Sequence, residues 1–189
     1  MSDRAGPRRA GTRLIGFLLV GLAMAACDAS PLVAGGPVPW TAQANGFVLQ
    51  ATMPKLDWLS TEAIGIDTTL TWTGDEPTKA IWTSGGGPVS FSLERADGTV
   101  TMPAASDLVC ARQDYARGVP TQIPFSKSGG YSDSDPNAVF FEQYFADPLL
   151  HLPRGQWKLI VTADAMLAEC AMNAPKLSIR LPDIVLFIH

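Results

Sequence analysis

Oxygen-bearing side chains gather in one short segment of the chain, where Asp133, Asp135 and Asn137 stand at alternate positions. Hard cations such as calcium require several oxygen ligands directed at one point, and alternate spacing favours that arrangement. The segment lacks the glycine and the later bidentate glutamate of the known calcium-binding loop. The residues therefore leave two alternatives, a calcium site and a solvated turn that caps a helix.

Histidine, the commonest general base, occurs only at positions 151 and 189. We expect His189 to be poorly held at the end of the chain, and His151 stands between two leucines, which is typical of a packing residue. Lys127 begins a Lys-Ser-Gly triplet similar to an element of penicillin-recognising serine enzymes, but the chain has no Ser-x-x-Lys tetrad to supply their nucleophile. The sequence therefore predicts a flexible loop at Lys127 and a protein that is not an enzyme.

Aromatic residues outside the apolar strand faces are the candidate binding anchors. Trp72 and Trp157 share the parity of aliphatic neighbours, which predicts that they lie in the core. Trp58 follows a loop, Trp82 lies beside a triple glycine, and Tyr131 follows Gly129-Gly130. Exposed aromatics at such positions serve as anchors in many binding surfaces, so Trp58, Trp82 and Tyr131 are the candidate anchors, although burial in the core is the commoner outcome for residues of these types.

Residues 1–26 have the three parts of an export signal. Arginines at positions 4, 8, 9 and 13 precede an apolar run at residues 14–26. That run, of about 13 residues, is shorter than the roughly 20 of a membrane-spanning helix. Small residues close the segment, as cleavage by a signal peptidase requires. The pattern predicts a signal helix that is removed from the mature protein.

The end of this leader, residues 22–27 (LAMAAC), resembles the lipobox of bacterial lipoproteins, in which a cysteine follows two small residues and an aliphatic one. The resemblance implies that the Cys27 sulfur receives a diacylglycerol, that cleavage occurs before Cys27, and that fatty acid, commonly palmitate, is added to the new amino group. It implies an anchor in the cell membrane or the outer membrane, with the domain facing the periplasm or the exterior. A plain secretory signal cut after Ala25 is the alternative.

Two further cysteines, Cys110 and Cys170, remain once Cys27 is assigned to the lipid. Two thiols left over outside the cytoplasm most often pair, so we expect a Cys110–Cys170 disulfide. A metal pair is disfavoured because neither cysteine has a neighbouring histidine.

The charge of the chain argues against nucleic acid as a partner. The formal net charge is −4 over 189 residues, and it becomes −7 once the four arginines and one aspartate of residues 1–26 are removed. An acidic protein lacks the basic footprint of nucleic-acid binding and is repelled by an anionic bilayer. Proline and glycine in residues 27–45 predict a flexible tether after the lipidated cysteine, which would hold the domain away from the membrane.

From residue 46 onward apolar residues recur with a period of two, for example at residues 64–72, 89–94 and 156–163. Short strands separated by Gly/Pro turns predict an all-β fold, an antiparallel β-sandwich over residues 46–189. Residues 152–161 (LPRGQWKLIV) resemble the turn and strand of bacterial immunoglobulin-like domains, in which a glycine corner precedes an aromatic that packs between the sheets. The resemblance implies an immunoglobulin-like fold.

Two segments break the strand pattern. Asp135 and Pro136 precede apolar residues at positions 140, 141, 144 and 145, which favours a short helix over residues 137–145, with a strand at 139–141 as the alternative. Residues 164–173 (DAMLAECAMN) have high helix propensity, and Asp164 is a candidate cap. We therefore expect one or two helical inserts.

These observations predict a lipid-anchored protein of the cell envelope with a non-catalytic β-sandwich that binds a protein, a peptide or a glycan, or has a structural role. Two alternatives stay open, an inhibitor or accessory subunit of an envelope protease and a calcium-dependent adhesion or carbohydrate-binding module. No cofactor is expected other than the lipid on Cys27 and, in the last alternative, calcium.

Overall fold

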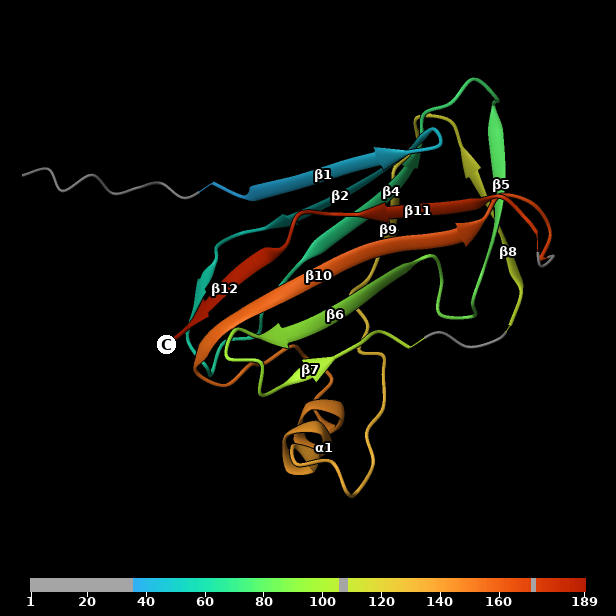
Figure 1. Cartoon of the computed structure of the whole chain (residues 1–189). Helices are drawn as coiled ribbons and strands as arrows, with labels where there is room; N and C mark the ends of the chain where they lie inside the picture. The colour runs from blue at the N-terminus through green and yellow to red at the C-terminus, as the bar shows by residue number, and fades with distance from the viewer. Residues whose placement is uncertain (1–35, 106–108, 171–172) are drawn as a thin grey trace, which may run out of the picture. The chain divides into compact units, whose positions relative to one another are not determined.

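The computed structural model describes residues 36–105, 109–170 and 173–189. Within these ranges the chain forms twelve strands and one helix (Figure 1). Their bounds are β1 (Val38–Ala44), β2 (Phe47–Met53), β3 (Asp57–Trp58), β4 (Asp67–Trp72), β5 (Thr78–Thr83), β6 (Val89–Arg95), β7 (Thr101–Met102), β8 (Ala111–Ala116), β9 (Thr121–Ile123), α1 (Ala138–Ala146), β10 (Gly155–Met166), β11 (Lys176–Arg180) and β12 (Ile184–Ile188). The predicted signal at residues 1–26, the lipid site at Cys27 and tether residues 28–35 lie outside the described ranges.

The first sheet, sheet A, has the order β1-β2-β4-β9, and all its strand pairs are antiparallel. β1 and β2 form a hairpin whose two turn residues, Asn45 and Gly46, have φ angles of 50° and 77°. Positive φ at both positions is the requirement of a type I′ turn, which Asn-Gly meets at little cost. The predicted tether is therefore wrong for residues 38–45, because β1 pairs with β2 along its whole length.

The second sheet, sheet B, is organised around the twelve-residue strand β10. β12 and β11 pair with successive halves of one edge of β10, and β6 pairs with the other edge. β5 joins β10 at Met166 and continues the sheet to β8, while β3 extends it beyond β12 as a parallel neighbour. In Figure 1 β10 runs as one long ribbon between these partners. The sheet is mostly antiparallel, as predicted.

One hydrophobic cluster joins the inward faces of the two sheets. Phe47 of sheet A meets Tyr115 of sheet B edge to face, with ring centroids 5.5 Å apart. Trp157 is fully buried in the cluster and Trp72 is 6% exposed, which confirms both as core residues. The Trp157 indole N–H donates to the Pro153 carbonyl at 2.9 Å, so the buried donor is satisfied. The prediction of an all-β fold built from two sheets is confirmed.

The two predicted helical inserts have different outcomes. α1 occupies Ala138–Ala146 and confirms the first, with Phe141 and Tyr144 buried beneath it. The second begins inside β10, which continues to Met166. Asp164 donates its backbone N–H to the Pro88 carbonyl at 2.8 Å, a contact that holds it in the sheet. The helix prediction is therefore wrong for the described residues 164–170, and at 164–166 strand pairing outweighs intrinsic propensity.

Candidate functional site

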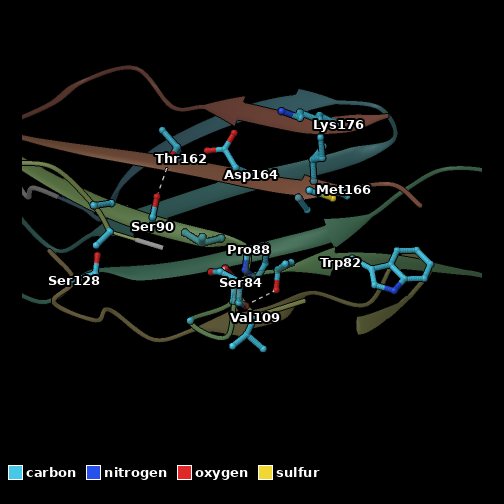
Figure 2. Close-up of a pocket in the computed structure, with 18 of the residues that line it drawn as sticks. Trp82, Ser84, Pro88, Ser90, Val109, Ser128, Thr162, Asp164, Met166 and Lys176 are labelled. Atoms are coloured by element: carbon cyan, nitrogen blue, oxygen red, sulfur yellow. Dashed lines mark hydrogen bonds between the residues drawn. The ribbon is translucent and has the colours of Figure 1, made fainter. Parts of the chain in front are cut away.

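A hollow of about 750 Å³ opens on the solvent-facing side of sheet B (Figure 2). It extends from the turn after β5 across β6 and β10 to the start of β11. Hydroxyl groups line much of it, at Ser84, Ser90, Ser92, Ser126, Ser128 and Thr162. Hydroxyls both donate and accept hydrogen bonds, so such a lining suits a polar ligand.

Strand alternation places the hydroxyls of Ser90, Ser92 and Thr162 on the outer face of the sheet. Val89 and Phe91 are buried, whereas Ser90 between them points outward and its hydroxyl lies 2.9 Å from that of Thr162 on the neighbouring strand. Asp164, two residues further along β10, accepts a hydrogen bond of 2.8 Å from the Ser178 hydroxyl. The polar groups of the hollow are thus held by cross-strand pairs on a sheet whose other face is core.

Trp82 lies at one end of the hollow, opposite Met166 in the sheet register. In Figure 2 its indole ring lies at the right, apart from the other labelled side chains. The Arg112 guanidinium lies over the ring at 5.8 Å from the centroid and is itself paired with Asp114 at 2.9 Å. One face of the indole is therefore engaged by a cation, while the ring stays half-exposed beside the hollow.

The other two predicted anchors lie elsewhere. Trp58 is 6% exposed and pairs with Ile188 through β3 and β12, so this candidate anchor is a core residue. Leu59, the residue after β3, is the exposed one. Tyr131 is 38% exposed, but its ring stacks on Phe145 of α1 at a centroid distance of 6.0 Å. The three aromatics do not form a common face.

Cys110 and Cys170 form a disulfide, which confirms the predicted pair. The bond joins the residue before β8 to the segment after β10, and both cysteines line the hollow. It therefore fixes two chain segments 60 residues apart at the margin of the candidate site.

The segment of the predicted calcium ligands makes internal hydrogen bonds. The Asp135 carboxylate accepts the backbone N–H of Asn137 at 2.8 Å, and the Asn137 amide donates to the Thr99 carbonyl at 2.7 Å. Asp133 is exposed. These contacts dock the start of α1 on the loop before β7. Among the residues that the structure describes, no group of three or more His, Cys, Asp or Glu side chains is placed to hold a metal ion.

A second, smaller hollow of about 270 Å³ lies between α1 and the loop after β3, and Ser60, Asp147 and His151 contribute to its lining. His151 Nδ1 lies 2.5 Å from Asp147 Oδ2, and because a carboxylate only accepts, Nδ1 carries the proton. Asp147 Oδ1 accepts the Leu149 amide at 2.8 Å. The His151 hydrogen bond, followed by that amide, holds the pKa of the Asp147 carboxyl below its ordinary value.

This arrangement was missed in the sequence, although the four-residue spacing of Asp147 and His151 was a usable signal. A histidine oriented by a carboxylate is half of a nucleophile-activating system. The third member would be Ser60, but in the described part of the chain no hydrogen bond links its hydroxyl to His151. The pair instead joins the end of α1 to the segment that leads into β10.

Lys127, which the sequence placed in a flexible loop, also acts at the end of α1. Its ammonium donates to the backbone carbonyls of Tyr144 and Asp147, each at 2.6 Å, and lies over the Tyr144 ring. Desolvation lowers the pKa of Lys127. Lys127 of the Lys-Ser-Gly triplet thus caps the C-terminal end of α1.

Within the described ranges no helix is both long and apolar enough to span a membrane. Comparisons of the chain with protein-family models, with curated proteins and with solved structures find no match.

Proposed function

We propose that the chain is a lipid-anchored protein of a bacterial cell envelope whose β domain binds a protein, peptide or glycan and catalyses no reaction. The hollow beside Trp82 is the proposed binding site, and it is the observation that carries the proposal. It combines a hydroxyl-lined floor on a rigid sheet with a half-exposed indole at one end. Hydroxyls supply orientation-specific hydrogen bonds, and an indole supplies flat apolar area at low entropic cost. We also propose that the two sheets form an immunoglobulin-like sandwich.

The leader and the disulfide support the proposed compartment independently. A cationic start, an apolar run and the lipobox-like ending at Cys27 are the sequence features of an exported lipoprotein. Disulfides persist in oxidising compartments and are rare in the cytosol. The Cys110–Cys170 bond is therefore in keeping with a domain on the outer side of the cell membrane.

The start of β1 at Val38 shortens the proposed tether. Ten residues, 28–37, separate Cys27 from the first strand, and fully extended they reach about 36 Å. The proposed mature chain carries a formal charge of −7, since four arginines and one aspartate are lost from the −4 of the whole sequence. Repulsion from an anionic bilayer would keep this tether extended.

The anchor is tested by the mass of the protein extracted from membranes of a bacterial expression host. We expect loss of residues 1–26, the added mass of a diacylglycerol on Cys27, and two hydrogens fewer for the disulfide. The Cys27→Ser variant should leave the membrane fraction, and Cys110→Ser is the matched control that should stay in it. A wild-type protein without lipid, or a Cys27→Ser variant that fractionates like wild type, would refute the anchor.

The binding site is tested with two probes, a glycan array and a display library of random linear peptides. A ligand selected on the wild-type domain should lose affinity for Ser90→Lys, which places a long cation in the hollow. It should keep its affinity for Gln50→Lys, a change on the outer face of sheet A. If neither probe yields a ligand, or if every ligand binds both variants equally, the hollow is not the binding site.

A further inference from the structure

The floor of the hollow offers hydrogen bonds from side chains rather than from a strand edge. β10 pairs with β6 over residues 157–163 on one side, and with β12 and β11 on the other. Its main-chain N–H and C=O groups are therefore used within the sheet. A ligand meets instead the hydroxyl groups, including the cross-strand pair of Ser90 and Thr162. One hydrogen bond between two hydroxyls leaves one proton and several lone pairs, so this pair can still donate and accept.

The lining of the hollow has no net formal charge. Among the described residues that line it, Asp164 and Lys176 are the charged ones, and their formal charges cancel. The proposed mature chain as a whole is, by contrast, strongly acidic. Because binding partners are usually complementary in charge, this lining suits a neutral ligand that is rich in hydrogen-bonding groups.

The two charged residues lie at the Trp82 end of the hollow. Met166 pairs with Trp82 on one side and with Lys176 on the other, which sets an indole, a thioether and an ammonium in one row across the sheet. Asp164 follows two residues back on the same face of β10, and Figure 2 shows it with Met166 and Lys176 along the adjoining strands β10 and β11. Its carboxylate accepts the Ser178 hydroxyl and has lone pairs for further donors. This end thus combines a strong acceptor and a strong donor with an aromatic ring.

The indole of Trp82 has one face to offer to a ligand. The Arg112 guanidinium lies over the other face, and Arg112 comes from β8, on the far side of β5 from β10. Met166 of β10 lines the hollow together with Trp82, whereas Arg112 does not. A ligand that reaches the ring from the hollow therefore meets the face opposite the guanidinium.

We propose that the ligand of this site is a neutral oligosaccharide, one of whose pyranose rings lies on the free face of Trp82 while its hydroxyl groups donate to Asp164 and accept from Lys176. This inference rests on the proposed function and specifies its ligand. The C–H face of a pyranose is flat and apolar, so it matches an indole, and its hydroxyls match groups that both donate and accept.

The size and the floor of the hollow support the same ligand class. Its volume of about 750 Å³ lies within the roughly 300–1,000 Å³ of small-ligand sites, enough for a few sugar units. An extended peptide is recognised mainly through the unpaired main-chain groups of a strand edge, which β10 does not offer. Side-chain hydroxyls with a stacking ring are sufficient for a sugar, which has no main chain to pair.

The test applies the detergent-extracted full chain to a glycan array that carries both neutral and acidic oligosaccharides, and then takes the best neutral binder into solution. In saturation-transfer NMR the ring C–H protons of one sugar unit should receive the strongest transfer, because they lie on the indole. Signals from acidic glycans alone would overturn the inference. If no glycan binds but library peptides bind and are lost in Ser90→Lys, the inference fails while the proposed binding site stands. If neither class binds, both fail.

Matched variants test the contacts themselves. Trp82→Ala should lower the affinity for that oligosaccharide at least about tenfold. Phe187→Ala, which removes a 42% exposed aromatic outside the hollow, should leave the affinity unchanged. Asp164→Asn keeps an oxygen for Ser178 but loses the charge, so binding should weaken several-fold. Equal affinities of wild type and Trp82→Ala would overturn the inference, and if Trp82→Ala fails to fold, an unchanged affinity in Asp164→Asn would do so.

Discussion

The ammonium of Lys127 donates a 2.6 Å hydrogen bond to the backbone carbonyl of Tyr144 in the last turn of α1. A second bond, to the Asp147 carbonyl, closes the same end of the helix. The last carbonyls of a helix lack intrahelical partners, and a cation there also meets the negative end of the helix dipole. Lys127 lies in sequence before the helix that it stabilises, so it ties the segment after β9 to α1.

Replacing Lys127 with methionine should destabilise the domain. The variant keeps the length of the apolar stem but leaves two carbonyl oxygens without a donor, at a cost of about 1–3 kcal/mol. Urea denaturation measures the change in the free energy of unfolding. Lys158→Met is the control, because Lys158 makes only a half-exposed 3.9 Å ion pair with Glu94. Equal effects of the two substitutions would contradict the capping role.

Alanine at Gly46 should destabilise the β1–β2 hairpin. The residue has a φ of 77°, and a Cβ there would overlap the ring of Trp72. Conformational strain and the displaced indole should together cost about 1–3 kcal/mol. Gly65→Ala is the control, since nothing lies within 4 Å of its Cβ position. A Gly46→Ala domain as stable as Gly65→Ala in thermal unfolding would show that the turn is not strained.

Asp147 should make stability depend on pH in the acid range. Because its hydrogen bonds lower the pKa of the folded carboxyl below the ordinary value of 3.8, the unfolded chain binds the proton more tightly. The stabilisation is therefore complete above that ordinary value and is lost as the pH falls through the lower folded value. Asp147→Asn should flatten the acid limb of a plot of unfolding free energy against pH. An unchanged limb would contradict the assignment.

Removal of the disulfide should destabilise the domain by about 4 kcal/mol on the chain-entropy model for a 60-residue separation. The Cys110→Ser/Cys170→Ser double variant and the reduced wild-type protein should unfold at similar urea concentrations, both well below the oxidised protein. Similar midpoints for the double variant and the reduced protein would show that the destabilisation comes from loss of the disulfide and not from the serine substitutions. Identical midpoints for oxidised and reduced protein would contradict a bridging role.

Ser60 should not react with a fluorophosphonate probe, because the His151–Asp147 pair is expected to serve the fold rather than a nucleophile. His151→Gln should lower the unfolding midpoint, and Ser60→Ala should leave it within error of wild type. Covalent labelling of Ser60 that disappears in His151→Gln would identify a hydrolase and refute the non-catalytic proposal.

Much of the strand pattern could be predicted, because the core needs one apolar face from each strand. The alternation of Val89, Ser90 and Phe91 identified both the buried face and the face that carries the hollow. The disulfide could be predicted from the expected compartment and the number of cysteines. α1 was signalled by Pro136 at its first turn and by the spacing of its apolar residues.

The errors occurred where a distant partner decides the local conformation. β1 is rich in small and polar residues and is a strand because β2 pairs with it, although Asn45-Gly46 was a hairpin signal that could have identified it. Asp164 lies in a strand despite its position in a segment of high helix propensity, because its amide donates to the Pro88 carbonyl, next to β6. The carbonyls that accept hydrogen bonds from Lys127 are 17 and 20 residues away in sequence, and no local sequence pattern predicts these contacts.

The position of β10 in the chain has a consequence for biosynthesis. This strand holds together β5, β6, β11 and β12, yet it is the tenth strand in chain order, and β11 and β12 follow it. Sheet B therefore cannot assemble until β10 has been synthesised. Until then β5 and β6 lack their central partner.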